Sequence, residues 1–409
     1  MMNVQTLKGF RDFLPREARK RQYVINSLKE VFESYGFEPL ETPALEYEEI
    51  LTGKYGEEGD KLMYRFRDHG GRKIALRYDQ TIPTARVVSY YLNELPLPFK
   101  RYQFQPVWRA ENTQKGRYRE FLQCDADIIG NDSTLADAEI LGMVHDSYTK
   151  LGLDILIKVN DRAILKKIPL NALPVVDKLN KIGDVGVVKE LVQKGFSYED
   201  ANNLLKQAKS FKASLYLRQV LDIYEKRYPQ DSWQFESTLV RGLDYYTGLI
   251  FEVVPKLTPQ SASLCGGGRY DNLIGIFANK QIPAVGFAIG FDRTFEAMQE
   301  NNLFPIELSY SITKVLVTIF SPDLLSNSLA LVSNLRNNFI NAEIYLTEDL
   351  TKEVPLDKQL KYADKKGIPF AIIIGPEEVE KNVVTIKNLQ TREQKTLSLS
   401  DAISLIHNS

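Results

Sequence analysis

One stretch of the sequence, from Lys100 to Arg119, concentrates basic side chains beside aromatic rings. It holds six lysines and arginines against a single acid, Glu111, which leaves a local surplus of five positive charges. The aromatic residues among them are Tyr102, Phe104, Trp108 and Tyr118. Cations bind phosphates and flat rings stack on bases, so this is the composition of a polyphosphate or RNA site. A solvated charged hairpin would have the same composition.

A second candidate is the glycine run of CGGGRYDNL, from Cys265 to Leu273. It matches neither phosphate-loop pattern, GxxxxGK[ST] or GxGxxG, which disfavours an ordinary nucleotide-binding module. Three glycines in a row let the backbone pack closely against a ligand or another strand. A plain turn is the alternative interpretation.

Metal and disulfide chemistry have little support in the sequence. The histidines His69, His145 and His407 are scattered, and Cys124 and Cys265 lie far apart without a CxxC or Cys/His cluster. Zinc sites and disulfide frameworks need characteristic spacings that are missing here. We therefore expect no zinc, no metal ligand set and a reducing, cytoplasmic location.

The elements that must position these residues follow from the hydrophobic pattern. Between Pro15 and Tyr35 apolar residues recur at helical spacing, and Gly36 follows where a helix end needs a cap. Short apolar runs then alternate with turn residues, and the stretch from Asp68 to Gly71 has the composition of a hairpin turn. These patterns predict an opening helix followed by a mostly antiparallel sheet. The runs are FEPLETPALEY, KLMYRFRDHGGRKIALRYD, LPLPFKRYQFQPVWRAE and RYREFLQCDADIIG.

Composition also divides the chain into parts. Residues from about 160 to 235 are rich in Leu, Lys and Ala at helical spacing, which indicates a helical insertion. Strand patterns return in LVRGLDYYTGLIFEVV, which reads as a strand pair with a turn, and PAVGFAIGFDRTFEAM reads as a strand followed by a helix. Later, strands alternate with helices, as is typical of an α/β domain. We expect domains at 1–310 and 313–409.

The bulk composition excludes several classes of protein. A chain of 409 residues with 44% hydrophobic residues is long enough for two or three domains with their own cores. Its formal net charge is −1, so any polyanion must be bound by local patches. No stretch approaches the roughly 18 apolar residues of a membrane span, and the N-terminal segment has no apolar signal region. We expect no membrane association.

The string FQPVWRAENTQKGRYREFLQCDADIIG, residues 104–130, resembles the second signature of class II aminoacyl-tRNA synthetases in its histidyl form. The resemblance implies that Arg109 holds the ATP α-phosphate or the substrate carboxylate, and that Phe121 is a stacking surface for adenine. It assigns the loop between them partly to ATP, through Glu111 and Arg117, and partly to the tRNA acceptor end, through Gln114 and Arg119.

The string LVRGLDYYTGLIFE, residues 239–252, resembles a segment peculiar to histidyl-tRNA synthetases. This implies that Arg241 is a catalytic cation that holds the attacking carboxylate near the α-phosphate. Tyr245 and Tyr246 would line the histidine pocket. In CGGGRYDNL, the family resemblance assigns Tyr270 to the wall of the same pocket. PAVGFAIGFDRTFEAM resembles the third class II signature, which places Arg293 along the ATP phosphates.

A histidine pocket needs carboxylates, because the substrate's α-ammonium and imidazole both donate hydrogen bonds. In LRYDQT, Asp79 and Thr81 align with the family's α-amino contact, and Gln80 between them belongs to the same histidine-binding segment. In FLQCDADIIG, Gln123 and Asp127 align with its histidine contacts. Some members carry Arg-Pro-Glu-Gly-Thr where this chain has Arg-Tyr-Asp-Gln-Thr, so the acidic side chain here is shorter.

The string KYADKKGIPFAIIIGPEEVEKNVVTIKNLQTREQKTL resembles the C-terminal anticodon-binding domain of the same family. Residues 313–409 hold 11 Lys plus Arg against 12 Asp plus Glu, so this domain has no basic excess. RNA contact there would depend on shape and a few residues. The resemblance thus implies an α+β class II catalytic core with a helical insertion, followed by an α/β anticodon-binding domain.

The activity that the resemblance implies is histidine–tRNA ligation. ATP would activate L-histidine to histidyl-adenylate and pyrophosphate, and the 3′ end of tRNA(His) would accept the histidyl group. Mg²⁺ would accompany ATP. Class II cores of this type pair through their opening helix and strand, so we expect a homodimer built partly on Gly36 to Tyr47.

The main alternative is a regulatory paralogue that binds histidine and controls a histidine-biosynthesis enzyme without charging tRNA. Such proteins resemble the catalytic core, but they usually depart from the pattern at the catalytic arginine and lack the C-terminal domain. Arg241 and the last hundred or so residues are both present here. The ligase interpretation is therefore favoured.

Overall fold

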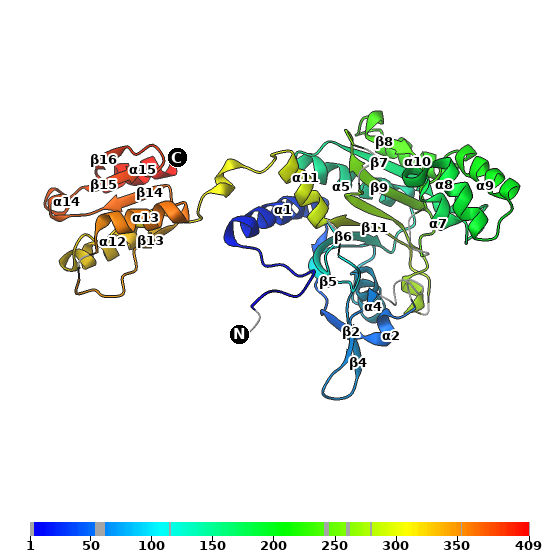
Figure 1. Cartoon of the computed structure of the whole chain (residues 1–409), viewed down its shortest axis with the longest axis horizontal. Helices are drawn as coiled ribbons and strands as arrows, with labels where there is room; N and C mark the ends of the chain where they lie inside the picture. Colours follow the sequence, from blue (N-terminus) through cyan, green and yellow to red (C-terminus); the bar gives the residue numbers. More distant parts are fainter. Residues whose placement is uncertain are drawn as a thin grey trace. The chain divides into compact units, whose positions relative to one another are not determined.

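The structure is a computed structural model that describes residues 4–53, 62–113, 116–240, 245–258, 262–278, 280–352 and 354–408. Its contacts group into two compact units (Figure 1). The first unit comprises Met1–Asp12 and Arg21–Leu303, and the second comprises Phe13–Lys20 and Phe304–Ser409. The assignment of catalysis to 1–310 and of anticodon binding to 313–409 stays a prediction.

The main sheet of the first unit has eight strands in the part of the chain that the structure describes. Its five inner strand pairs are antiparallel, and its two outer pairs are parallel. The expected mostly antiparallel sheet is therefore confirmed. In spatial order the strands are β1 (Glu38–Pro39), β5 (Phe99–Trp108), β6 (Glu120–Ile129), β11 (Ala284–Gly290), β10 (Cys265–Arg269), β9 (Leu249–Pro255), β7 (Ile155–Asp161) and β8 (Trp233–Phe235).

The paired strands β5 and β6 give this sheet two chemically different faces, because successive side chains of a strand point to opposite sides. On one face, the rings of Tyr102 and Phe104 pack against Phe32 of helix α1 (Pro15–Ser34), at centroid distances of 5.9 and 5.5 Å. The Tyr102 ring is buried and belongs to the hydrophobic core, so the interpretation of Tyr102 as a stacking surface for bases is wrong. The opposite face carries polar side chains.

The opening helix has the predicted stripe and the predicted end. Val24, Leu28 and Phe32 on one side of α1 are buried. Gly36 then adopts a φ of +75°, a left-handed conformation that glycine enters with little strain, and its N–H donates to the carbonyl of Glu33.

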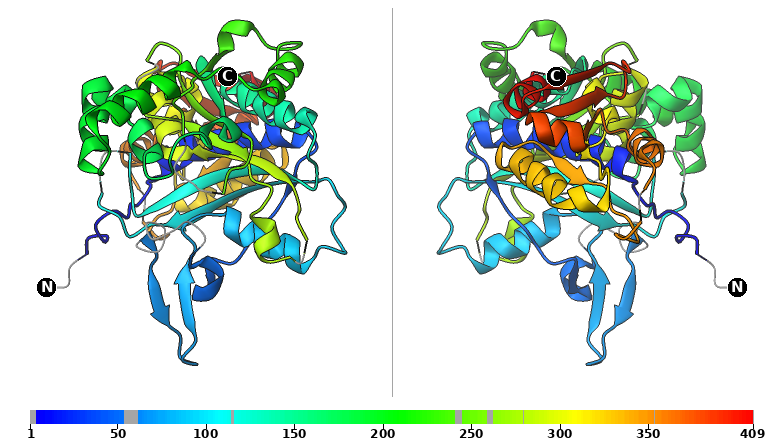
Figure 2. Two further views of the ribbon diagram at one scale, coloured as in Figure 1. Left: turned by 90° about the vertical axis from the view of Figure 1, so that its right-hand side faces the viewer. Right: turned by 90° about the vertical axis from the view of Figure 1, so that its left-hand side faces the viewer.

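A smaller three-stranded sheet extends from the main sheet of the first unit (Figure 2). Its strands, in spatial order, are β2 (Leu45–Tyr47), β4 (Lys73–Leu76) and β3 (Arg65–Arg67), and all pairs are antiparallel. The predicted hairpin turn between β3 and β4 is confirmed, since the Gly71 N–H donates to the Asp68 carbonyl. Helices α2 (Glu48–Leu51) and α4 (Thr81–Tyr90) flank this sheet in sequence, and the pattern had not indicated α4.

The expected helical insertion is confirmed. Its helices are α6 (Arg162–Leu165), α7 (Leu173–Val176), α8 (Leu179–Gln193), α9 (Tyr198–Ser210) and α10 (Leu215–Tyr224), followed by the short η1 (Gln230–Ser232). Helices α5 (Thr134–Lys150) and α11 (Phe291–Glu300) and the short η2 (Ile274–Ile276) complete the first unit. The segment interpreted as a strand pair with a turn contributes only β9 among the described residues.

The second unit has a mixed sheet with helices, as expected for an α/β domain. Its strands within the described ranges are, in spatial order, β13 (Ala342–Ile344), β12 (Val315–Val317), β14 (Phe370–Ile373), β15 (Val384–Asn388) and β16 (Gln394–Leu397). Its helices are η3 (Ile306–Ser309), η4 (Pro322–Leu324), α12 (Leu325–Asn337), α13 (Leu356–Lys366), α14 (Pro376–Lys381) and α15 (Leu399–His407). The hydrophobic pattern had not indicated α14, β16 or α15.

Candidate active site

The polar face of β5 and β6 carries a row of side chains that face one another across the strand pair. In the register, Arg101 lies opposite Asp127, Gln103 opposite Asp125, and Gln105 opposite Gln123. All but Gln105 are buried. Buried polar groups in such number are satisfied by one another or by a ligand. This face of the sheet is therefore a candidate binding site.

Asp127 is held from two sides. Its carboxylate forms an ion pair with Arg101, and the hydroxyl of Tyr270, just past the end of β10, donates a hydrogen bond to it. The structure thus brings together two of the predicted histidine contacts, Asp127 and Tyr270. Arg101 is fully buried, so the interpretation of this cation as a polyphosphate or RNA ligand is wrong. Lys100 pairs with Glu139 at 2.6 Å.

A glycine on the neighbouring strand makes room for the Asp127 carboxylate. Gly286 of β11 lies opposite Asp127 in the register. A Cβ at this position would come within 1.8 Å of Asp127 Oδ1 and 2.6 Å of the Ala126 carbonyl oxygen, closer than real Cβ contacts occur. Any side chain at position 286 would therefore displace the carboxylate. The hydrophobic pattern predicted this strand but gave no sign of the glycine's role.

The start of helix α4 brings a second carboxylate to the same face. Asp79 is 4% exposed; its Oδ1 accepts a long hydrogen bond of 3.4 Å from the backbone, and its Oδ2 has no partner among the described residues. The fully buried amide of Gln80 donates to the backbone carbonyls of Gln105 and Gln123, at 2.7 and 3.1 Å. Gln80 thereby fastens the start of α4, where Thr81 is the first helical residue, to β5 and β6.

Three buried carboxylates share this region: Asp79, Asp125 and Asp127. Burial raises the pKa of Asp79 to about 7 and that of Asp125 to about 8, and it also raises the pKa of Asp127. The Arg101 guanidinium opposes the rise at all three carboxylates, but it forms an ion pair only with Asp127. Where these carboxyl groups are ionised, the region carries more negative charge than its ion pairs balance, and this favours a cationic ligand.

These shifts predict a dependence of stability on pH. A carboxylate whose pKa rises on folding holds its proton more tightly in the folded state, so its contribution to stability is lost as the pH rises from about 4 to about 7 or 8. The double variant Asp79→Asn/Asp125→Asn lacks these groups. We expect the variant to have a higher free energy of unfolding than the parent, as measured by urea denaturation. This difference between variant and parent should be larger at about pH 8.5 than at about pH 5. A gain that does not change with pH would contradict the prediction.

Arg109 lies just beyond the end of β5, beside the ring of Phe121 near the start of β6. The guanidinium carbon is 5.1 Å from the ring centroid, and Nε donates to the carbonyl of Tyr78 at 3.0 Å. Arg109 also opposes the rise in the pKa of Asp79, which places the cation near that carboxylate. A guanidinium next to a flat ring and next to the carboxylate-lined pocket fits a nucleotide whose phosphates point toward a bound amino acid.

The loop that follows Arg109 lies against helix α11. Arg117 is half exposed and pairs with Glu111 at 3.6 Å, while Arg119 donates from Nε to the Glu111 carbonyl at 3.2 Å. A Cβ on Gly116 would lie 3.7 Å from Cγ of Arg293, in the first turn of α11. The structure thus brings the loop and Arg293 together, although they are far apart in sequence.

Three tyrosine rings contact one another, and the hydroxyl of one of them, Tyr270, donates to Asp127. Tyr245 contacts Tyr246 at a centroid distance of 4.6 Å and Tyr270 at 5.7 Å. Burial raises the pKa of Tyr245 and of Tyr270 well above the usual value, so both hydroxyls remain hydrogen-bond donors at neutral pH. Arg241 and Gln114, the predicted catalytic cation and a predicted tRNA contact, lie outside the described residues.

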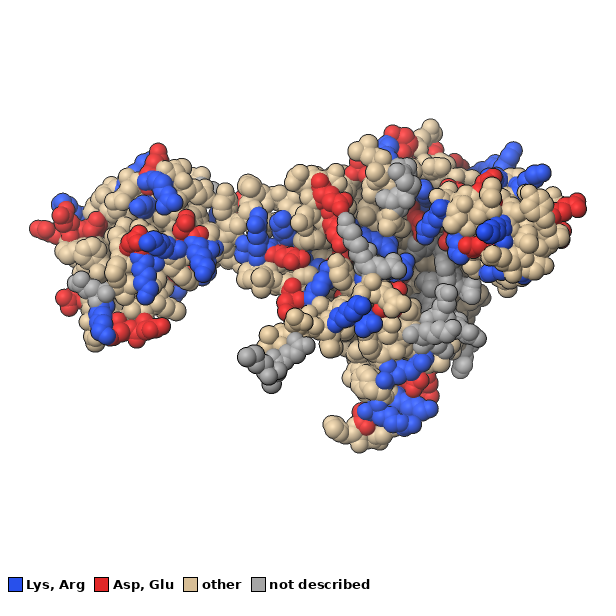
Figure 3. Space-filling view, viewed as in Figure 1, with Lys and Arg blue, Asp and Glu red and all other residues tan. Residues whose placement is uncertain are grey.

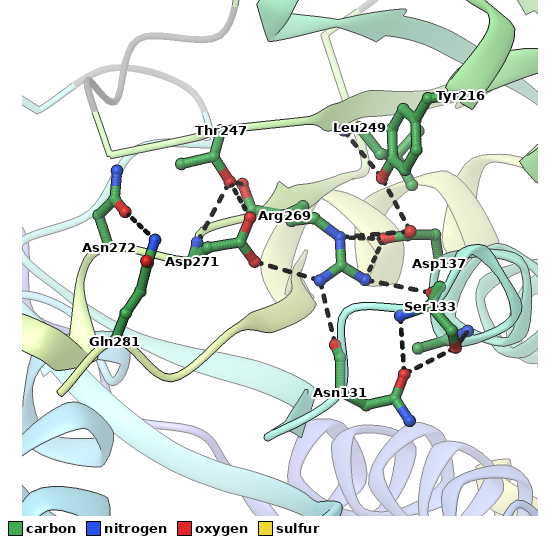
Figure 4. A network of polar contacts seen from close by, with 11 residues as sticks. Asn131, Ser133, Asp137, Tyr216, Thr247, Leu249, Arg269, Asp271, Asn272 and Gln281 are labelled. Atoms are coloured by element: carbon green, nitrogen blue, oxygen red, sulfur yellow. Dashed lines mark hydrogen bonds and ion pairs between the residues drawn. The ribbon is translucent and has the colours of Figure 1, made fainter.

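A polar network at the end of β10 anchors the segments that carry the tyrosine cluster of Tyr245, Tyr246 and Tyr270 (Figure 4). Its centre is Arg269, which donates from Nε to Asp137 of α5 at 2.9 Å and from Nη1 to Asp271 at 3.1 Å. Asp137 also accepts from the hydroxyl of Tyr216 in α10 at 2.8 Å, and Asp271 accepts from Thr247 at 2.7 Å. The network joins α5, the helical insertion and the residues on both sides of the tyrosine cluster.

Sequence reasoning missed several of these residues. Arg101, Asp137 and Arg269 act as buried counter-ions, and a buried ion pair leaves no local signal because its partners are distant in sequence. Asp125 stood in the string FLQCDADIIG, where the alternation of strand side chains alone would have placed it on the same face as Asp127. Gly286 could be found only once the neighbouring strand was known.

A metal centre built from side chains is not seen in the described ranges. Nowhere in them do three or more His, Cys, Asp or Glu residues come together in a group that could hold a metal ion. Helices there also fall short of the length and hydrophobicity required to cross a membrane.

The architecture, a mostly antiparallel sheet with a helical insertion followed by an anticodon-binding unit, is that of a class II aminoacyl-tRNA synthetase. A family model described as "Histidyl-tRNA synthetase" matches residues 9–182 and 181–294, and one described as "Anticodon binding domain" matches 314–409. The chain belongs to the histidyl-tRNA synthetase family.

Individual relatives agree with the family models over almost the whole chain. A histidine–tRNA ligase of Cytophaga hutchinsonii is 40% identical over 97% of this chain and 98% of its own length. One of Wolinella succinogenes is 38% identical over 97% and 96%. The crystal structure of histidyl-tRNA synthetase from Nostoc sp. PCC 7120 has a TM-score of 0.84 at 27% identity and covers 100% of both chains.

The fold alone does not separate the ligase from the regulatory alternative. A protein described as an ATP phosphoribosyltransferase regulatory subunit/histidyl-tRNA synthetase, from Bacillus halodurans C, has a TM-score of 0.72 at 20% identity over 91% of this chain. That likeness shows the fold only. The sequence relatives, which match over nearly full length, favour the ligase.

Proposed function

We propose that the chain is a histidine–tRNA ligase that activates L-histidine with ATP and transfers it to the 3′ end of tRNA(His). The observation that carries the proposal is the juxtaposition of a carboxylate-lined pocket with the Arg109 guanidinium and the Phe121 ring. The substrate carboxylate attacks the α-phosphate to give histidyl-adenylate and pyrophosphate. A terminal ribose hydroxyl of the tRNA then takes the histidyl group and AMP leaves.

The proposed roles follow from charge and position. Asp79, with Gln80 and Thr81, binds the α-ammonium, and Asp127 with Tyr270 binds the imidazole while Tyr245 and Tyr246 enclose it. Arg109 and Arg241 hold the reacting carboxylate and α-phosphate, and stabilise the charge that develops at phosphorus. The adenine stacks on Phe121. Support for these roles comes from the shared face of β5 and β6 and from the hydrogen bond between Tyr270 and Asp127.

The remaining nucleotide contacts are proposed from the loop next to α11. Glu111, Arg117 and Arg293 contact the polyphosphate of ATP. Gln114 and Arg119 contact the acceptor end of the tRNA. Mg²⁺ would accompany ATP and would neutralise phosphate charge. Such a site needs only one or two protein carboxylates besides the phosphates, and Glu111 beside the loop arginines suits that requirement.

Residues 313–409 are proposed to bind the anticodon stem of the tRNA. On the face of this unit seen in Figure 3, acidic and basic side chains are interspersed, in keeping with the balance of 11 basic and 12 acidic residues. Recognition there then depends on shape and individual contacts. Participation in translation would place the protein in the cytoplasm.

We also propose a homodimer built partly on Gly36 to Tyr47. Leu45 and Tyr47 on β2 and Phe66 on β3 are 42%, 52% and 45% exposed, which leaves large apolar side chains for a partner on this small sheet. A mass of about twice that of the chain is expected in solution at micromolar concentration. A monomeric mass would contradict this part of the proposal.

The decisive experiment is ATP–pyrophosphate exchange with each of the twenty amino acids. We expect histidine alone to drive exchange, and we expect the variant Arg241→Ala to lose it by about 100-fold or more, because a charge-stabilising group at the transition state is removed. Exchange driven by another amino acid, or by none, would remove the proposed function. A fully active Arg241→Ala variant would instead remove only the role of that arginine.

A further inference from the structure

One polar residue on the pocket face of β6, Asp125, has no role in the site as proposed so far. It lies between Gln123 and Asp127 on the same side of the strand and is 2% exposed. Its Oδ2 accepts a hydrogen bond from Nε2 of Gln123 at 2.8 Å, and its Oδ1 has no partner among the described residues. A half-satisfied buried carboxylate requires an explanation, and a missing ligand is one.

The surrounding protein does not supply the missing partner. Gln103, directly opposite on β5, donates its amide hydrogens to Thr42 and Gln105, and Ala288, opposite on β11, has no polar side chain. The buried guanidiniums of Arg101 and Arg77 are engaged elsewhere. Within the described ranges, no cation lies within ion-pair distance of Asp125.

The hydrogen bond between Gln123 and Asp125 also orients the amide. A carboxylate oxygen accepts, so Gln123 must turn its NH₂ group toward Asp125 and leave its carbonyl oxygen for another donor. Along β6, Gln123 lies between Phe121, the proposed adenine surface, and Asp127, the proposed imidazole contact. A histidine whose imidazole met Asp127 and whose carboxylate met the nucleotide beside Phe121 would then have its α-ammonium near Gln123.

We infer that Asp125 is a positioning residue for histidine binding, which holds the Gln123 carbonyl toward the substrate α-ammonium and supplies negative charge beside it. The inference deepens the proposed function and rests on it. The histidine pocket then presents two carboxylates to the ammonium, Asp79 directly and Asp125 through Gln123. Neither forms an ion pair with another described residue.

The charges that face Asp125 agree with this role. Arg101 from β5 and Arg77 from the edge of the small sheet favour its ionised form, whereas Asp127 on β6 and Asp79 before α4 oppose it. Burial and these neighbouring charges together raise the pKa of Asp125 to about 8. An ammonium beside the carboxylate would favour its ionised form and lower that pKa again.

The test is ATP–pyrophosphate exchange by the full chain carrying Asp125→Asn, which keeps an acceptor for Gln123 but removes the charge. We expect the KM for histidine to rise about 10- to 100-fold, as for loss of a charged hydrogen-bond partner, while kcat and the KM for ATP stay within about threefold. Histidinol, which keeps the ammonium, should inhibit more weakly by the same factor. Inhibition by 3-(imidazol-4-yl)propionate, which lacks the ammonium, should not change.

Thermal unfolding separates this role from a structural one. At about pH 8 we expect Asp125→Asn, and likewise Asp125→Ser, to have a Tm no lower than the parent, because an unpaired buried charge is removed. The matched control Asp137→Asn deprives buried Arg269 of its partner and should lower the Tm. A histidine KM within twofold of the parent, equal effects on both inhibitors, or a lowered Tm in both Asp125 variants would overturn the inference. A parent that does not activate histidine would instead overturn the proposed function.

Discussion

Replacing Arg109 with alanine should lower the rate of histidyl-adenylate formation by about 100- to 1000-fold, the effect of removing one preorganised donor from a charge-stabilising site. The structure holds this side chain rigidly. Its Nε is bonded to the carbonyl of Tyr78 at 3.0 Å, and its guanidinium carbon lies 5.1 Å from the centroid of Phe121. Nη1 and Nη2 form no hydrogen bond or ion pair within the described ranges, which suits a fork that binds a phosphate or carboxylate.

The measurement is single-turnover formation of histidyl-adenylate at saturating histidine and ATP. Arg109→Lys keeps the charge but loses the planar fork, so we expect it to recover only part of the rate. The control is Arg227→Ala. This side chain is 65% exposed and remote from β5 and β6 in sequence, so its removal should leave the rate of histidyl-adenylate formation unchanged. A rate for Arg109→Ala within threefold of the parent would show that the phosphate is held by other groups.

Gly286→Ala should abolish histidine-dependent exchange, with a loss of about 100-fold or more in kcat/KM for histidine. The added methyl would lie 1.8 Å from Oδ1 of Asp127, so the carboxylate must leave the position that it shares with Arg101 and Tyr270. Losing a buried recognition carboxylate is among the larger specificity effects, because the donors that remain lose their partner. Overpacking of the sheet should also lower the free energy of unfolding by about 1–3 kcal/mol.

Two measurements decide this prediction. Isothermal titration should show that ATP binding is retained while histidine binding is lost, and urea denaturation should report the change in stability. Gly275→Ala is the matched control, since a Cβ there would meet its nearest neighbour at 3.5 Å, an ordinary contact. Histidine affinity in Gly286→Ala equal to that of the parent would mean that Asp127 does not bind the substrate.

Much of the fold could be predicted from the sequence because its signals are local. The opening helix, the hairpin turn at Asp68 to Gly71 and the strand-then-helix pattern that ends in α11 each depend on residues within one short segment. The elements that were missed, such as α4 and α15, are short, with 10 and 9 residues. Helix α4 begins with Thr81, directly after Asp79 and Gln80, whose buried side chains are polar and so give no apolar helical pattern.

The predicted site residues also divide into those that the local sequence indicated correctly and those that it did not. Asp127 and Tyr270 were proposed from separate strings, and the structure joins them by a hydrogen bond. Arg101 was misinterpreted because its charge suggested a surface, whereas it is fully buried. The number of charged residues in a segment does not show which of their side chains point into the protein and which point to solvent.

The sequence by itself determined the family, the order of the elements and the strings that carry the chemistry, because these are properties of neighbouring residues. Only the tertiary structure decided which polar side chains meet. It set Arg101 against Asp127, left Asp125 without an ion-pair partner among the described residues, and required a glycine at position 286. The physical reason is that burial and pairing depend on strands brought together from distant parts of the chain, and the same charge is worth far more inside a protein than in water.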